Sequence, residues 1–288
     1  MIHALDHVLV SVSDLEAASA SYETLLGRRP SWRGEHPGLG TENALFRLGN
    51  GYLELLAPAG AGAFADQLRA RIAERGEGPL GLAFATDDGD ACAKLLRERG
   101  VAAADPLAGQ GRERTSGAER RWRNVMLPPE ATRGVMVFCI EHETALDVLP
   151  VAEPTADSDA VVEGFDHVVV TSKDPDATRA FYGDQLGLRL ALDKTFEKYG
   201  SRLLFFRVGG VTIEIGGRLG EDLDPDAPDE FWGIAYRVPD IAVAHARLAA
   251  SEADVSEIRT GRKAGTRVFT ARAPTHGVAT LVIGGDGP

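Results

Sequence analysis

Two copies of one short stretch decide the fold: Leu5-Asp6-His7-Val8 and, 160 residues later, Phe165-Asp166-His167-Val168. Further along the chain the same offset matches, without a gap, Tyr22 with Tyr182, Leu26-Gly27 with Leu186-Gly187, Phe46-Arg47-Leu48-Gly49 with Phe206-Arg207-Val208-Gly209, and Leu53-Glu54-Leu55 with Ile213-Glu214-Ile215. The distance from His to Glu is also kept, since 54 − 7 and 214 − 167 both equal 47. An ungapped repeat of this length indicates a duplicated chain, in which the repeated His and Glu are the most informative polar residues.

The bulk properties fit a globular protein of about two domains. The 288 residues are 44% hydrophobic and 26% charged, with a net charge of −12. Such a charge argues against nucleic-acid partners and against anionic membranes, because both require clustered cations. The one basic cluster, residues 119–123, is predicted to be a strand whose long side chains are solvated. A small molecule is therefore the expected partner.

The cysteine content and the lack of targeting segments indicate a cytoplasmic protein. Cys92 and Cys139 form no paired motif, so we expect two small buried thiols in a reducing compartment. The chain shows neither a signal peptide nor an apolar run of the roughly 20 residues that a membrane span requires.

The first repeat predicts a β-α-β-β-β unit. Residues 5–12 have the composition of a strand, and Ser13-Asp14 then provides a helix N-cap. A helix over 15–26 is predicted to end at Gly27, which suits a left-handed C-cap. The predicted strands that follow are residues 30–33, 43–48 and 52–57, the last two joined as a hairpin at Gly49-Asn50-Gly51.

This order of elements is predicted to occur four times. The second copy has a strand at 80–86, a helix at 88–99 and strands at 121–127 and 135–141; the third spans 165–216; the fourth has strands at 233–238, 267–271 and 279–283 and a helix at 241–251. One unit leaves a concave apolar face open, and pairing two units encloses a cup. We therefore predict an α+β protein of two half-open barrels. The domains would be 1–145 (units 1–78 and 79–145) and 164–288 (units 164–228 and 229–288), joined by a linker over 146–163.

Strand alternation places the repeated His and Glu in the cups. Leu5, His7 and Leu9 are predicted to share one face, and Tyr52, Glu54 and Leu56 another. If the two strands are neighbours in the sheet, the imidazole and the carboxylate lie side by side. Asp6 and Asp166 should then face away and satisfy backbone groups.

These stretches resemble the vicinal oxygen chelate superfamily. The resemblance rests on the Leu-Asp-His-Val strand, a helix with Tyr22 that ends in Leu26-Gly27, and the strand Tyr52-Leu53-Glu54-Leu55. That superfamily contains lactoylglutathione lyase, extradiol dioxygenases, an epimerase, fosfomycin-modifying enzymes and the bleomycin-resistance proteins. The first half is most similar to its glyoxalase-like domains, through residues 36–43, 121–123 and 138–141.

The resemblance implies a divalent metal (Fe, Mn, Ni or Zn) held by side chains of the first and fourth strands. His7, Glu54, His167 and Glu214 are the candidate ligands. In the partner units, Gly81 and Gly233 replace the first-strand ligand, and Phe138 and Leu281 replace the fourth-strand ligand. Each cup therefore has an incomplete ligand set.

Other residues could add to each cup. His36 and Asn43 could point into the first cup, where Phe138 would also line a substrate site, although capping the turn at 38–40 is another use for Asn43. The second cup has Phe196 at the position of His36, with Glu197 or Tyr199 nearby. We therefore expect the first cup to be the ligand site. The alternative for each His–Glu pair is a buried hydrogen-bonded couple that needs no ion.

Two functions remain open from sequence. One is an enzyme of the lyase, isomerase or dioxygenase type, acting on a small oxygen-rich metabolite with His7 and Glu54 as catalytic candidates but without glutathione-dependent glyoxalase activity. The other is a metal-free protein that binds or sequesters a small molecule, as antibiotic-resistance proteins do. The sequence also leaves open a homodimer and whether units pair within or between the halves.

Overall fold

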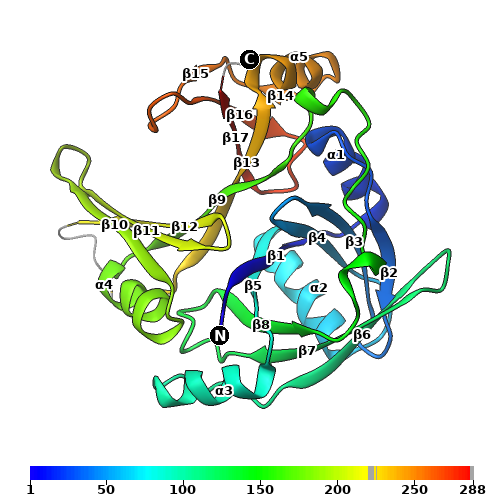
Figure 1. Ribbon diagram of the computed structural model, residues 1–288, viewed down its shortest axis with the longest axis vertical. Coiled ribbons are helices and arrows are strands. Elements are labelled where there is room, and N and C mark those ends of the chain that lie inside the picture. Colours follow the sequence, from blue (N-terminus) through cyan, green and yellow to red (C-terminus); the bar gives the residue numbers. More distant parts are fainter. Residues whose placement is uncertain (220–223, 225, 286–288) are drawn as a thin grey trace.

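The computed structural model describes residues 1–219, 224 and 226–285, apart from the side chains of Leu146 and Tyr199. The first half forms a closed eight-stranded barrel, and the second half forms an open nine-stranded sheet (Figure 1). Each sheet is built from two repeated units. The fold class is the predicted α+β arrangement.

The barrel of the first half has the strand order β1-β4-β3-β2-β6-β7-β8-β5. Its strands are β1 (Ala4–Ser11), β2 (Trp32–His36), β3 (Thr41–Leu48), β4 (Gly51–Pro58), β5 (Gly78–Ala85), β6 (Leu107–Glu113), β7 (Glu119–Met126) and β8 (Met136–His142). Its helices are α1 (Leu15–Leu26), α2 (Ala63–Arg75) and α3 (Gly89–Glu98). β1 pairs with β5, and a short contact between β2 and β6 closes the ring. The units therefore pair within this half.

Helix α1 shows how local sequence sets an element. The Asp14 side chain accepts a hydrogen bond from the Ala17 amide at the start, and Gly27 ends the helix with φ 66°. The buried face consists of Leu15, Ala18, Ser19, Tyr22, Leu25 and Leu26. Both predicted caps of this helix are confirmed.

Helix α2 was missed in the sequence analysis, yet it shapes the first barrel. Phe64, Leu68 and Ile72 recur every four residues, which is the spacing of one helical face. They pack against Leu9 and Phe138 inside the barrel. In Figure 1, α2 lies within the ring of barrel strands. The helix therefore contributes apolar side chains to the barrel interior.

The second half is an open sheet in the order β10-β11-β12-β9-β13-β17-β16-β14, with β15 paired to β16. Its strands are β9 (Gly164–Ser172), β10 (Arg189–Phe196), β11 (Ser201–Val208), β12 (Val211–Arg218), β13 (Glu230–Asp240), β14 (Asp254–Val255), β15 (Arg259–Thr260), β16 (Arg267–Ala273) and β17 (Ala279–Gly285). Its helices are α4 (Pro175–Arg179), the π-helical η3 (Ala180–Gln185), the short η4 (Glu197–Tyr199) and α5 (Ile241–Ala250). The segment between the halves contains two short 3-10 turns, η1 (Leu146–Val148) and η2 (Ser158–Ala160).

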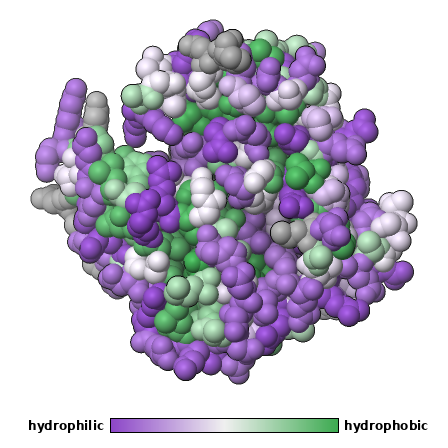
Figure 2. All heavy atoms as spheres, viewed as in Figure 1, coloured by the Kyte–Doolittle hydropathy of each residue, from purple (hydrophilic) through white to green (hydrophobic). Residues whose placement is uncertain are grey.

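The open sheet exposes apolar side chains. Leu192 on β10 and Trp232 on β13 are more than 40% exposed, at 47% and 55%. Figure 2 shows green, apolar side chains among the purple ones on the left, where β10–β12 lie in Figure 1. The side chains of His167 and Glu214 are 16% and 17% exposed, against 3% and 8% for His7 and Glu54, so the second cup is more accessible to solvent than the first.

A β-bulge changes the faces predicted for β1. Leu5 pairs with Phe84 and His7 with Ala83, so Asp6 is an extra residue in β1. Leu5 therefore packs in the core outside the barrel interior, and the prediction that it shares the cup face with His7 is wrong. The second half repeats the irregularity, with Phe165 and His167 opposite adjacent residues of β13.

Within the described residues, two contacts between an acidic and a basic side chain join the halves. Nδ1 of His276 lies 2.7 Å from Oε2 of Glu77, and Nε of Arg133 lies 3.2 Å from Oδ1 of Asp229. Glu77 directly precedes β5 and Asp229 directly precedes β13, so each repeat places an acid at the same point. Each acid meets a base from the opposite half. His276 therefore makes a contact between the two halves.

In the described ranges, no helix is long and apolar enough to cross a membrane. Cys92 and Cys139 are both buried and free, as predicted.

We predict that Arg133→Ala lowers the free energy of unfolding by about 3–5 kcal/mol at pH 7, because it leaves buried Asp229 without its cation. Burial already raises the pKa of Asp229. Loss of Arg133 should raise the pKa of Asp229 further. The difference in unfolding free energy between wild type and variant should therefore be largest at neutral pH and become smaller in acid, where the carboxyl takes up a proton. Urea unfolding at pH 7 and pH 4.5 measures both effects.

Arg272→Ala is the control, because Arg272 pairs with Asp254 on the surface, where such pairs contribute about 0–1 kcal/mol. Equal stability of the Arg133 and Arg272 variants would contradict the assignment of the Arg133–Asp229 pair to the interface core.

Candidate functional site

The repeated His and Glu lie side by side in each half. β1 and β4 are parallel neighbours, with His7 opposite Tyr52 and Leu9 opposite Glu54. Nε2 of His7 lies 3.4 Å from Oε2 of Glu54. The equivalent atoms of His167 and Glu214 are 3.7 Å apart. The adjacency predicted from alternation is therefore present twice.

Aromatic rings hold the His7 imidazole in place. It stacks on Tyr52 with ring centres 4.5 Å apart, and it meets the edge of Phe138 at 5.5 Å. Its side chain is only 3% exposed. An imidazole with so little freedom presents its Nε2 atom in one fixed direction.

Asp6 is a partner of this imidazole, contrary to the prediction that it faces away to satisfy backbone groups. Its Oδ1 lies 2.6 Å from Nδ1 of His7, and its Oδ2 lies 2.9 Å from Nε2 of His142. Burial by itself would raise the pKa of Asp6, but the hydrogen bonds from His142 and His7 outweigh it and hold the pKa well below its usual range. An ionised Asp6 accepts both bonds, so Nδ1 of His7 carries a proton.

The other side of Glu54 is bound by Asn43. Nδ2 of Asn43 donates to Oε1 of Glu54 at 2.8 Å and also lies 3.1 Å from Nε2 of His36. His36 must accept through Nε2, so its Nδ1 donates to Thr41 at 2.9 Å. Burial lowers the pKa of His36, which favours this neutral form. One network of polar contacts therefore runs from β8 through β1, β4 and β3 to β2. Its links are hydrogen bonds, except for the 3.4 Å contact between His7 and Glu54.

This network borders a cavity of about 340 Å³ inside the barrel. The apolar part of its wall consists of Leu9, Leu45, Leu56, Phe64, Trp122, Met126, Met136, Phe138 and Ile140. Exposed Leu39 and Leu107 also line it, so they mark its opening to solvent. A mostly apolar cavity with a few convergent polar groups is typical of small-molecule sites. His36, Asn43 and Phe138, the substrate-binding candidates from sequence, all line it.

Arg120 also lines the cavity, and the sequence analysis missed it. The basic cluster at 119–123 was predicted to be a solvated strand. Arg121 is exposed as predicted, but Arg120 is only 7% exposed and sits among aromatic rings. The signal was present in the sequence, since Arg120, Trp122 and Asn124 alternate along β7 and so share its inner face.

Neighbouring strands fill the positions where the partner units lack ligands. Gly81 takes the place of His7, and a Cβ there would lie 2.7 Å from the carbonyl oxygen of Met136. A Cβ on Gly233 would lie 2.5 Å from the carbonyl oxygen of Ala279. Within residues 1–219, 224 and 226–285, no group of three His, Cys, Asp or Glu side chains is arranged to hold a metal ion.

The second cup retains the His–Glu pair but not the neighbouring polar residues of the first cup. Nδ1 of His167 lies 2.8 Å from Oδ1 of Asp166, as in the first half. Leu203 occupies the position of Asn43 and Phe196 that of His36, because both lie 160 residues further along. Glu197 lies in η4, and the side chain of Tyr199 is outside the described part of the chain.

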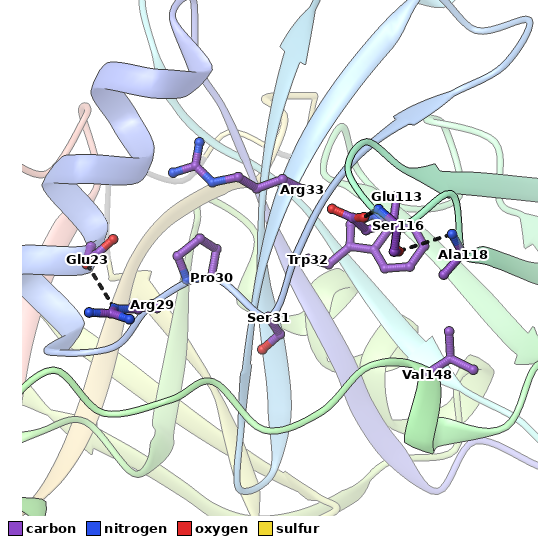
Figure 3. Close-up of a pocket in the computed structure, with 10 residues that line it drawn as sticks. All are labelled: Glu23, Arg29, Pro30, Ser31, Trp32, Arg33, Glu113, Ser116, Ala118 and Val148. Atoms are coloured by element: carbon purple, nitrogen blue, oxygen red, sulfur yellow. Dashed lines mark hydrogen bonds and ion pairs between the residues drawn. The ribbon is translucent and has the colours of Figure 1, made fainter.

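A larger hollow of about 500 Å³ lies on the outside of the barrel (Figure 3). Its surface groups pair locally: Glu23 contacts Arg29, and the Ser116 amide donates to Glu113. The polar groups therefore do not converge on a common point, and we assign the site to the barrel interior.

Each half of the chain matches the model of a known protein family. Residues 5–161 match the model of the Glyoxalase-like domain, and residues 166–270 match that of the Glyoxalase/Bleomycin resistance protein/Dioxygenase superfamily. The first match covers more than half of the 288 residues. A comparison with curated protein sequences finds no match to the chain.

Solved structures share the tandem arrangement. A hypothetical protein from Staphylococcus aureus is 12% identical with a TM-score of 0.67, over 98% of this chain and 100% of its own. A mutant of 4-hydroxymandelate synthase from Streptomyces coelicolor is 15% identical with a TM-score of 0.70, over 99% of this chain and 93% of its own. At these identities the likeness concerns the fold alone.

We predict that Asp6→Asn lowers the free energy of unfolding by about 3 kcal/mol at neutral pH, since it weakens two hydrogen bonds to a buried charge. The native contacts depress the pKa of Asp6 below 3.8, so their contribution is complete above that value and is lost as the pH falls below it. The difference between wild type and variant should shrink below about pH 4.

Asp166→Asn provides the matched control in the more exposed second cup, where the decrease in the free energy of unfolding should be smaller. Chemical unfolding from pH 3 to pH 7 measures both variants. Identical curves for wild type and Asp6→Asn would remove Asp6 from the network.

Proposed function

The chain belongs to the glyoxalase-like domain family, and we propose that its first half binds a small organic molecule in the barrel without a metal. The observation that carries the proposal is the cavity of about 340 Å³, lined largely by apolar side chains and bordered by a polar network. The His7–Glu54 pair would give the ligand one fixed polar contact. The protein would then act as a small-molecule binding or sequestering protein.

The hydrogen bonds within the site support binding without a metal. A metal between Glu54 and His36 would need Oε1 and Nε2, yet Asn43 donates hydrogen atoms toward both. His7 and Glu54 alone supply two donors, fewer than a stable protein site normally has. The residues present therefore do not fit a resident divalent ion in this arrangement.

The loss of ligand positions in the partner units supports the same proposal. Phe138 lines the cavity at the position equivalent to Glu54, since it pairs with Ala83 as Glu54 pairs with Leu9. Together with Met126 and Met136, it makes this wall apolar and adaptable in shape. Such a wall suits the body of an organic ligand better than a hydrated cation.

One observation favours a second candidate, an enzyme of the lyase, isomerase or dioxygenase type that acts on a small oxygen-rich metabolite with bound Fe, Mn, Ni or Zn. In both halves an aspartate accepts from Nδ1 of the repeated histidine. Histidines that bind metals through Nε2 commonly have such a partner. In this candidate His7, Glu54, His167 and Glu214 would be the ligands.

Elemental analysis of the full-length protein, purified without chelators, separates the two candidates. We expect Fe, Mn, Ni and Zn to stay well below one equivalent per chain, because the donor set is incomplete. Near-stoichiometric metal that disappears in His7→Ala and persists in His167→Ala would contradict binding without a metal and support the enzyme candidate instead.

A binding experiment tests the proposed site itself, with indole and benzamide as neutral probes small enough for the cavity. We expect one probe molecule per chain by calorimetry, and a loss of affinity of about 3- to 10-fold in Asn43→Leu, which removes a polar contact as the second half does naturally at Leu203. Glu214→Gln should bind as wild type. Binding that is lost in Glu214→Gln and kept in Asn43→Leu would place the site in the second cup.

A further inference from the structure

We propose that Arg120 is the receptor for an anionic group, so that the barrel of the first half takes a small carboxylate with an apolar body. The inference rests on the proposed function, because it names the ligand class for the same cavity. Arg120 is only 7% exposed and lines the cavity wall.

The surroundings of the guanidinium are aromatic. Its central carbon lies 5.7 Å from the ring centre of Trp32, 5.4 Å from Tyr52 and 5.9 Å from Trp122. These distances fit cation–π contacts. Such contacts provide no carboxylate to pair with the charge.

Few partners for these donors are present. A guanidinium has five N–H groups. The Tyr52 hydroxyl interacts with the Arg120 side chain, but no carboxylate in the described parts of the chain lies within 4.0 Å of it. A buried charge without a carboxylate in direct contact is unfavourable, so an anionic ligand would supply the missing partner.

Other partly buried arginines show the contrast. Arg28 donates to the carbonyl oxygens of Ala152 and Val162, and Arg247 donates to those of Leu25 and Ala160. These two guanidinium groups are satisfied by the fold. Arg120 instead lines a cavity, which leaves room for an external oxygen pair to meet its planar fork.

The distribution of the remaining polar groups defines the rest of the ligand. Oδ1 of Asn43 and Oδ1 of Asn124 are buried acceptors without a partner, and both residues line the cavity. They call for a hydroxyl or N–H donor on the ligand. Tyr52 stays protonated, because burial raises the pKa of its phenol, and its hydroxyl can therefore also serve the anionic group.

The strand geometry separates the two ends of the cavity. Leu107 at the opening pairs with Asn124 on β7, and Arg120 lies four residues before Asn124. At the rise of a strand this is about 13 Å. A ligand would therefore place its carboxylate at Arg120 and its apolar body along Trp122 toward the opening.

The test compares trans-cinnamate with its neutral amide, cinnamamide, by calorimetry on the full-length protein at pH 7. We expect wild type to prefer the acid by at least about 30-fold, in keeping with a charged hydrogen bond. Arg120→Gln should reduce the preference to within about 3-fold. Arg120→Lys, which keeps the charge and loses the planar fork, should keep part of it and guards against a folding defect in the first variant.

Arg121→Gln is the matched control, because its side chain is exposed on the opposite face of the same strand, and it should keep the full preference. Equal affinity for acid and amide in wild type, or a preference that survives in both Arg120 variants, would overturn the inference. If neither cinnamate probe binds while indole or benzamide does, the carboxylate assignment fails and the proposed binding function stands.

Discussion

The contact between Asp6 and His7 is the constraint on which the site depends. A bulge in β1 makes Asp6 an extra residue in the strand and brings its carboxylate to Nδ1 of the imidazole. Because Nδ1 is engaged, Nε2 has to face Glu54 and the cup. The same bulge and the same contact occur at Asp166 and His167, so both copies of the repeat retain the bulge together with its Asp–His contact. Without it, the ring could turn and the pair would have no fixed direction.

The Asp, His and Glu side chains of this arrangement have different surroundings in the two halves. In the first half, closure of the ring between β2 and β6 and the insertion of α2 enclose the pair in a small cavity. Asn43 and His36 extend the network, and Arg120 adds a cation to the same wall. In the second half the sheet stays open, with leucine and phenylalanine at the positions of Asn43 and His36. This difference in closure and in polar lining is the reason why we propose a ligand site in the first half alone.

Much of the fold could be predicted from sequence, because repeats and alternation are local signals. The offset of 160 gave the units, and period-two alternation brought His7 and Glu54 together on neighbouring strands. The failures have physical reasons. A bulge adds one residue and reverses the faces before it, so Leu5 and Asp6 were misplaced. Arg120 was taken for a solvated cation because burial depends on barrel closure, which is a long-range property. Helix α2 was missed although its apolar residues recur at helical spacing.

The most direct measurement of the central claim is the long-range 1H–15N correlation spectrum of the histidine rings in the full-length protein. It reports which ring nitrogen carries a proton, and therefore whether the network exists in solution. We predict that His7 carries a proton on Nδ1, where Asp6 accepts it, and that His36 carries a proton on Nδ1 and none on Nε2, which accepts from Asn43. A proton on Nε2 of His36, or a His7 ring that averages between its two tautomers, would contradict it.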